Sequence, residues 1–103
     1  IVNQAMVYIE EHYAEKLTLQ AVADCCYVSQ WHLSKLLNRH TGQSFYDILN
    51  TVRIQKAKEL LLDPRLKIGE IGERVGYADT AHFARTFKKQ EGMSANEYRN
   101  TLK

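Results

Sequence analysis

Residues 17–27, LTLQAVADCCY, and residues 66–76, LKIGEIGERVG, carry apolar side chains at the same spacing, 49 positions apart. Residues 33–44, LSKLLNRHTGQS, and residues 83–94, FARTFKKQEGMS, repeat one another in the same way at an offset of 50. Apolar residues three and four positions apart are typical of amphipathic helices. Each copy is therefore predicted to be a short helix, a turn and a second helix ending at glycine, with one residue added to the second turn.

The helical spacing runs through nearly the whole chain, and no stretch keeps the alternation of a half-buried strand. Helices are expected to stop at Gly42, at Asp63-Pro64 and at Gly92. The first helix should cover residues 2–13 and the longest residues 45–62. The expected N-caps are Thr18, Ser29, Ser44, Asp79 or Thr80, and Ser94.

These boundaries predict an all-α fold of about seven helices. Residues 1–43 and 64–103 would form two helix-turn-helix subdomains, joined by a linker helix over residues 44–63.

The composition is that of an ordinary globular chain, with 45% hydrophobic and 25% charged residues among 103. This length allows one compact domain, or two very small ones that share a wall. No apolar run approaches the ~18 residues that span a bilayer, and no signal-peptide pattern opens the chain. We therefore expect a cytoplasmic protein without a membrane partner. The first residue is Ile1 rather than Met, which indicates a fragment of a longer chain.

The net charge of +2 is only mildly basic, but 13 of the 14 Lys and Arg residues follow position 30. The two cysteines, Cys25 and Cys26, are adjacent, and chain neighbours almost never form a disulfide because the geometry is strained. Two thiols without a disulfide framework agree with a reducing compartment.

The second helix of each copy has a predicted core face and a predicted outward face. On a helical wheel the core faces hold Leu33, Leu36, Leu37 and His40 in one copy, and Phe83, Thr86, Phe87 and Gln90 in the other. The outward faces hold Trp31, Ser34, Lys35 and Asn38, and Ala81, Ala84, Arg85 and Lys88. A basic residue thus stands at equivalent outward places in both helices.

The outward residues leave two interpretations open. Trp31 could be a core tryptophan, but its wheel position favours an exposed indole. Against a DNA duplex, such an indole could pack on a thymine methyl or on sugar atoms in the major groove. Lys35 and Arg85 could be solvated surface charges. Their repetition favours contacts with DNA, and Arg85 can offer a bidentate fork to guanine. Lys88, Lys89 and Arg39 lie further along or to one side, where phosphates are the expected partners.

No constellation for catalysis or metal binding stands out. The four histidines, His12, His32, His40 and His82, lack carboxylate or cysteine partners at useful spacing, and His32 and His82 are expected to pack at the edge of the core. Cys26 is predicted to face inward. There is no zinc-site spacing and no glycine-rich phosphate loop. We expect a protein that is not an enzyme and needs no cofactor.

The chain resembles the AraC/XylS family of bacterial transcription regulators, whose DNA-binding domain has two helix-turn-helix subdomains and a long joining helix. In the first half the resemblance lies in VSQWHLSKLL (28–37), TGQSF (41–45), and RIQKA (53–57) with Leu60, Leu61 and Leu62. In the second half it lies in IGEIGERVGY (68–77), HFARTFKK (82–89) and GMSANEYR (92–99). It implies sequence-specific binding of double-stranded DNA, with two recognition helices in successive major grooves.

The resemblance also implies site residues. Base contacts map to Gln30, Trp31, Ser34 and Lys35, and to Thr80, Ala81, Ala84 and Arg85; phosphate contacts are expected from Asn38, Arg39, Lys88 and Lys89. Because Ala81 and Ala84 are short, the second helix should make fewer hydrogen-bonded base contacts. Tyr27 departs from the glycine usual in the family's first turn, so that turn is expected to be wider or differently closed. Ala95 replaces a usual proline, at little cost in a helix.

The partners implied are a double-stranded operator, RNA polymerase if the protein activates, and a missing N-terminal domain. That domain would be a receiver or an effector-binding domain. The sequence that flanks the motifs most resembles the branch of the family that is linked to receiver domains, the output half of two-component response regulators. Two alternatives remain: a helical protein-interaction module that docks through the Trp31 face, and the DNA-binding domain of a larger repair or adaptor protein.

Overall fold

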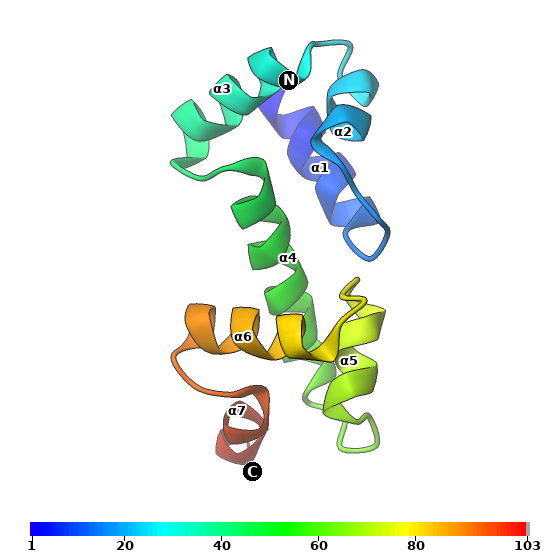
Figure 1. Ribbon diagram of the computed structural model, residues 1–103, viewed down its shortest axis with the longest axis vertical. Helices are drawn as coiled ribbons and strands as arrows, with labels where there is room; N and C mark the ends of the chain where they lie inside the picture. Colours follow the sequence, from blue (N-terminus) through cyan, green and yellow to red (C-terminus); the bar gives the residue numbers. More distant parts are fainter. Residues whose placement is uncertain (103) are drawn as a thin grey trace. The chain divides into compact units, whose positions relative to one another are not determined.

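The computed structural model describes residues 1–102, which form seven α-helices and no strand (Figure 1). The helices are α1 (Val2–His12), α2 (Leu19–Cys25), α3 (Gln30–Thr41), α4 (Phe45–Leu60), α5 (Ile68–Arg74), α6 (Thr80–Glu91) and α7 (Ala95–Thr101). The predicted all-α class is confirmed. Within this part of the chain no helix has both the length and the apolar character to cross a membrane.

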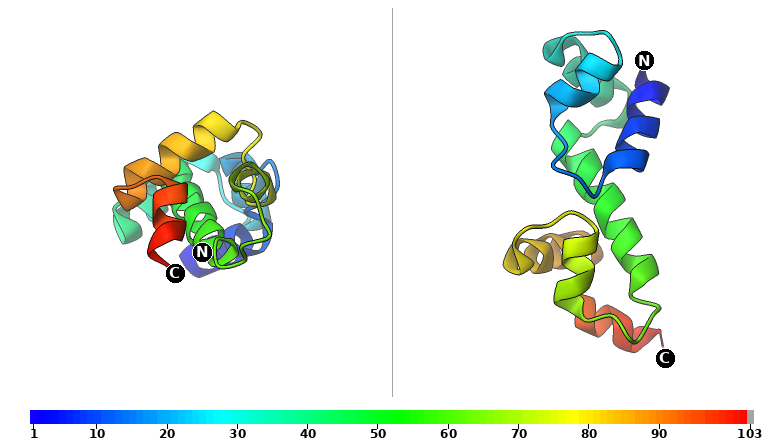
Figure 2. Two further views of the ribbon diagram at one scale, coloured as in Figure 1. Left: turned by 90° about the horizontal axis from the view of Figure 1, so that it is seen from below. Right: turned by 90° about the vertical axis from the view of Figure 1, so that its right-hand side faces the viewer.

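The helices pack into two compact units, and the boundary falls inside α4 between Val52 and Arg53. The first unit buries Ala5 and Ile9 of α1, Val22 and Ala23 of α2, Leu33 and Leu37 of α3, and Phe45, Ile48 and Leu49 of α4. Here α1 contacts both α2 and α3, and the right-hand view of Figure 2 shows α1 beside α2. The first half of α4 thus belongs to this core.

The second unit has its own core, built from the second half of α4 with α5, α6 and α7. It buries Ile54, Ala57 and Leu61, then Ile71 and Val75, then Phe83 and Phe87. Ring contacts connect Tyr77 to Phe83 (5.5 Å between centroids), Phe83 to Phe87 (5.9 Å) and Phe87 to Tyr98 (5.7 Å). Whether residues 44–63 also act as a spacer between DNA-binding units stays a prediction.

Helix α7 is tied to the end of α4 by one arginine in its last turn. Arg99 donates from Nε to the Leu61 carbonyl at 3.2 Å and from Nη2 to the Asp63 carbonyl at 3.1 Å. These carbonyls lie beyond the helical hydrogen-bond ladder, where the chain turns after α4. Arg99 therefore closes the second unit by satisfying backbone groups that the helix leaves open.

Most predicted helix ends are confirmed by their capping bonds. Ser29 accepts from His32 N–H at 3.1 Å, Asp79 accepts from Ala81 N–H at 2.9 Å, and Ser94 forms a reciprocal capping box with Glu97. Gly42 and Gly92 end α3 and α6 with φ of 74° and 78°. Of the two candidates, Asp79 rather than Thr80 is the cap of α6.

Two helices end earlier than expected. Helix α1 ends at His12 rather than Tyr13, and α4 ends at Leu60 rather than Leu62. After α4 the backbone tightens, since Leu62 N–H bonds to Glu59 and Asp63 N–H bonds to Leu60. The Asp63 carboxylate then accepts from the side chain and backbone of Arg65, which lowers the pKa of Asp63 to about 2.

The core faces of α3 and α6 are shorter than predicted. His40 and Gln90 are exposed, because the packed surface ends one turn earlier at Leu37 and Phe87. His32 and His82 are also exposed rather than packed, although the His82 ring meets Tyr77 edge-on at 5.1 Å. Leu102 is 40% exposed because it follows the last residue of α7.

Candidate nucleic-acid interface

In the first unit, α2 and α3 form a helix-turn-helix whose turn is closed by backbone hydrogen bonds. Tyr27 N–H bonds to the Asp24 carbonyl at 3.2 Å, and Val28 N–H bonds to the Ala23 carbonyl at 3.1 Å. Tyr27 has a left-handed φ of 58°.

The second unit repeats this turn between α5 and α6. Gly76 N–H bonds to Glu73 at 3.1 Å and Tyr77 N–H bonds to Gly72 at 2.9 Å, each 49 positions after its counterpart. The expectation that Tyr27 makes the first turn differently closed is therefore wrong. Both residues at this place have a positive φ, 58° for Tyr27 and 108° for Gly76, and the same pair of hydrogen bonds closes each turn.

The two turns differ in length and in packing. Four residues separate α2 from α3 and five separate α5 from α6, as predicted. A Cβ on Gly72 would lie 2.8 Å from Cδ2 of Phe83, so this glycine makes room for the ring. In the first unit the equivalent pair is Ala23 with the smaller Leu33. The first unit thus pairs a larger residue on its first helix with a smaller one on its second helix, and the second unit does the reverse.

The outward faces of α3 and α6 lie opposite buried residues. Leu33 and Leu37, and Phe83 and Phe87, are fully buried. All twelve predicted contact residues are exposed: Gln30, Trp31, Ser34, Lys35, Asn38, Arg39, Thr80, Ala81, Ala84, Arg85, Lys88 and Lys89. The core alternative for Trp31 is excluded, since its side chain is 69% exposed. Each unit thus presents one helix face that its own core does not use.

Trp31 and Lys35 form a pair on the outward face of α3. The Lys35 ammonium lies 4.2 Å from the centroid of the indole, which is cation–π geometry. The residues are four positions apart, one helical turn. The ammonium is thereby held over the ring instead of extending freely into solvent.

A polar hollow joins this face to the start of α4. It is lined by Ser34, Lys35, Asn38, Arg39 and Ser44. Ser44 caps α4, since its hydroxyl accepts from Asp47 N–H at 3.2 Å. Ser44 is predicted from the sequence as a helix cap but is not among the candidate contact residues. The signal for including it was its position two residues after Gly42, where α3 stops. The hollow brings predicted base contacts and phosphate contacts together around two cations.

Gln30, another predicted base contact, has a hydrogen-bond partner inside the first unit. Its side-chain amide donates to Gln20 on α2, and Gln20 in turn donates to Asp24 at 2.6 Å. A contact between the Gln30 amide group and a base would have to replace this hydrogen bond.

On α6, three basic residues share the exposed surface. Arg85 lies nearest the N-terminal end of the helix, and Lys88 and Lys89 follow one turn later. Hydrogen bonds from Ser94 lower the pKa of the Glu97 carboxyl in the first turn of α7. The positive charge of Lys88 lowers this pKa further, so Lys88 lies close to the start of α7. The one acidic residue of α6, Glu91, pairs with Lys58 at 3.0 Å.

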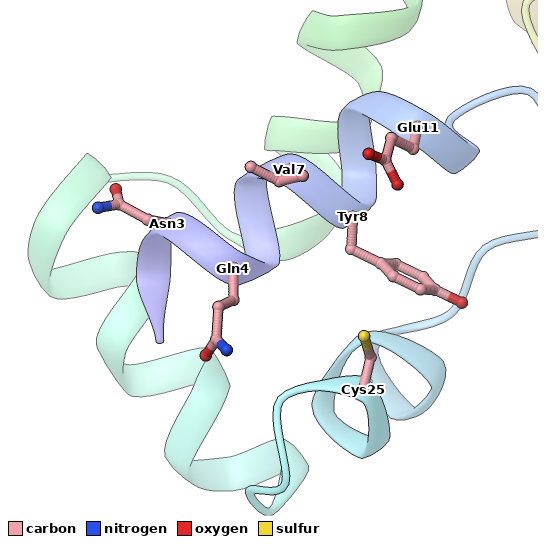
Figure 3. A pocket seen from close by; sticks show the side chains of 6 residues that line it. All are labelled: Asn3, Gln4, Val7, Tyr8, Glu11 and Cys25. Carbon is pink, nitrogen blue, oxygen red and sulfur yellow. The ribbon is translucent and has the colours of Figure 1, made fainter.

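A second hollow in the first unit lies between α1 and α2. It is lined by Asn3, Gln4, Val7, Tyr8, Glu11 and Cys25, and Figure 3 shows Cys25 pointing toward Tyr8. It contains no basic side chain and is not suited to nucleic acid.

The two cysteines lie at the C-terminal end of α2. Cys25 and Cys26 are both free thiols, and burial together with the neighbouring Cys25 raises the pKa of Cys26. Among residues 1–102 no cluster of His, Cys, Asp and Glu is arranged to hold a metal ion.

Comparison with known proteins identifies the family. A family model described as a helix-turn-helix domain matches residues 22–101. The C-terminal domain of AraT, a response regulator from Geobacillus stearothermophilus, superposes with a TM-score of 0.91 at 44% sequence identity, covering 97% of this chain and 84% of that one. The chain belongs to the AraC-type family of helix-turn-helix DNA-binding domains.

Longer relatives place this AraC-type domain within larger proteins. The transcriptional activator RhaS of Enterobacter sp. (strain 638) is 34% identical over 97 residues, which are 94% of this chain and 35% of RhaS. The bifunctional transcriptional activator/DNA repair enzyme AdaA of Bacillus subtilis is 32% identical over 96 residues, 93% of this chain and 46% of AdaA. The chain thus spans less than half the length of these relatives.

Proposed function

We propose that this AraC-type domain is the output domain of a bacterial transcription regulator and binds a double-stranded DNA operator in a sequence-specific way. The observation that carries the proposal is the repetition of one exposed basic face, on α3 and on α6, each backed by a core of its own. In helix-turn-helix proteins the second helix enters the major groove, and its N-terminal residues reach the base edges.

The residues nearest the start of each recognition helix would contact bases. On α3 these are Gln30, Trp31, Ser34 and Lys35, and on α6 they are Thr80, Ala81, Ala84 and Arg85. The Trp31 indole would pack on a thymine methyl or on sugar atoms, and Arg85 would donate two hydrogen bonds to guanine. With two alanines in its set, α6 would supply fewer hydrogen bonds than α3.

The residues further along would contact phosphates, which position the protein without specifying sequence. Asn38 and Arg39 would do so beside Ser44 in the polar hollow, and Lys88 and Lys89 on α6. Each cation that neutralises a phosphate releases counterions, so binding should weaken steeply with added salt.

The proposal also covers the N-terminal domain, the further partner and the cellular location of the whole protein. The similarity to the AraT domain, which comes from a response regulator, favours an N-terminal receiver domain. An effector-binding domain is the alternative. RNA polymerase would be a partner if the protein activates transcription. A cytoplasmic location follows from the DNA partner, since bacterial DNA lies in the cytoplasm.

A second candidate function is supported by the similarity to AdaA, which is named both as an activator and as a repair enzyme. In that case the chain would serve as the DNA-binding part of a repair protein, with the chemistry carried elsewhere.

The deciding experiment is selection of bound sequences from random duplex DNA, followed by a gel shift at several salt concentrations. An operator-binding domain should enrich one motif and bind it with salt-sensitive affinity. Recovery of no motif, with salt-insensitive capture of a protein partner instead, would favour a protein-interaction module and overturn the proposal.

A further inference from the structure

Tyr27 combines two features that are unfavourable for a folded domain. It is the non-glycine residue with positive φ among the described residues, and its side chain is 93% exposed. Large side chains are rare in the left-handed region because Cβ crowds the backbone. An exposed aromatic ring also gains nothing from burial within the unit.

The internal repeat shows that the turn does not need a tyrosine. Gly76 holds the equivalent place in the second unit, with positive φ and the same two closing hydrogen bonds. A glycine meets this backbone conformation without steric cost. The tyrosine ring is therefore not explained by the local fold, and a strained, exposed residue of this kind is a candidate for function.

The position of Tyr27 in the motif indicates what the ring could contact. It lies three residues before Gln30, the first residue of α3. In helix-turn-helix complexes the first helix crosses the DNA backbone while the start of the second helix enters the groove. The turn between them therefore lies near the strand that borders the groove.

The chemistry of the surrounding segment suits a DNA strand. From Tyr27 to Asn38 the chain carries no acidic residue, and the exposed Trp31 lies four positions after Tyr27. A phenol can donate a hydrogen bond to a phosphate oxygen while its ring packs on the sugar.

We propose that Tyr27 contacts the sugar–phosphate backbone at the edge of the half-site bound by α3. This inference rests on the proposed DNA-binding function. The second unit has no equivalent contact, because Gly76 has no side chain, so the contact is one-sided.

The test compares three substitutions, Tyr27→Gly, Tyr27→Asn and Tyr27→Phe, with the original chain. Glycine and asparagine both tolerate the left-handed conformation, so the thermal midpoint should stay the same or rise. DNA affinity should fall about fivefold or more with either, equally on selected and scrambled duplexes, because phosphate contacts carry no sequence information. Tyr27→Phe should lose a smaller part, the hydroxyl contribution.

The salt dependence separates this contact from those of lysine and arginine. Tyrosine is neutral and releases no counterions, so the slope of log affinity against log salt should not change in any of the three variants.

The outcomes that overturn the inference are distinct. If the original chain binds no duplex, the proposed function fails and the inference fails with it. If the original chain binds and Tyr27→Gly binds equally well, the inference alone is wrong, and a loss of transcription without a loss of binding would assign Tyr27 to a protein partner. If Tyr27→Gly lowers the thermal midpoint together with affinity, the ring supports the turn and the inference is also wrong.

Discussion

Arg85 and Lys88 are the residues that most sharply separate base contact from phosphate contact, because both are exposed on α6 one turn apart. Arg85→Ala should cost about 1–3 kcal/mol of binding free energy on the selected operator and relax the preference at one base pair. Lys88→Ala should weaken all sequences alike and lower the salt slope by about one unit. Affinities on selected and scrambled duplexes at several salt concentrations measure both effects.

Solvated surface charges with no DNA role would change binding by less than about 0.5 kcal/mol in either variant. An unchanged base preference in Arg85→Ala would mean that the outward face of α6 is wrongly assigned. Thermal unfolding of both variants is the control, since neither side chain is part of the core.

At the scale of the element, α5 fits against α6 because Gly72 leaves room for Phe83. Gly72→Ala should lower the free energy of unfolding by about 1–3 kcal/mol, since the new methyl would lie 2.8 Å from the ring. Gly69→Ala on the same helix is the matched control, because its methyl would meet Thr80 at an ordinary 3.7 Å. That change should be neutral or stabilising, as alanine favours helix over glycine.

A second substitution tests the compensation between the copies. Phe83→Leu, combined with Gly72→Ala, would recreate the Ala23–Leu33 pair of the first unit. Denaturant unfolding of the single and double variants should show that the double variant is more stable than the sum of the single effects predicts. Strict additivity would contradict direct packing between these two positions.

The junction between α4 and α7 gives a further prediction at this scale. Arg99→Ala should lower the free energy of unfolding by about 1–3 kcal/mol, because two partly buried carbonyls lose a charged donor. Arg65→Ala is the matched control: Arg65 also bonds to Asp63, but through an exposed ion pair that water screens, so this change should have little effect on stability. Equal losses in the two variants, measured by chemical denaturation, would refute the assigned role of Arg99.

At the scale of the whole molecule, the tandem repeat predicts how much DNA one chain covers. If α3 and α6 enter successive major grooves, footprinting should protect two blocks about 10 base pairs apart, one helical turn of DNA. One chain should suffice, and the two half-sites should differ in sequence, because Trp31 with Lys35 and Ala81 with Arg85 present different chemistry.

Three results would contradict this arrangement: a single protected block with a dispensable second unit, a strictly palindromic selected site, or a Hill coefficient near two on DNA. Stoichiometry by titration of a labelled duplex distinguishes one bound chain from two.

The chain by itself determined the features that depend on a few neighbouring residues. The seven helices, the caps at Thr18, Ser29 and Ser94, the glycine stops and the exposed faces of α3 and α6 were all predictable. Each depends on a hydrogen bond between near neighbours or on a spacing of three to four residues. Such local interactions can be predicted from the amino-acid sequence because they involve only residues that are close together in it.

Tertiary structure alone decided where burial ends and which distant groups meet. His40 and Gln90 lie on the predicted core faces, yet they are exposed, since burial on these helices ends one turn earlier at Leu37 and Phe87. The hollow that includes Ser44, the fit of Phe83 over Gly72 and the bonds of Arg99 to Leu61 and Asp63 all join separate elements. Helical periodicity gives the direction of a side chain from its own helix axis but not what lies beyond it, and that depends on how the other helices pack.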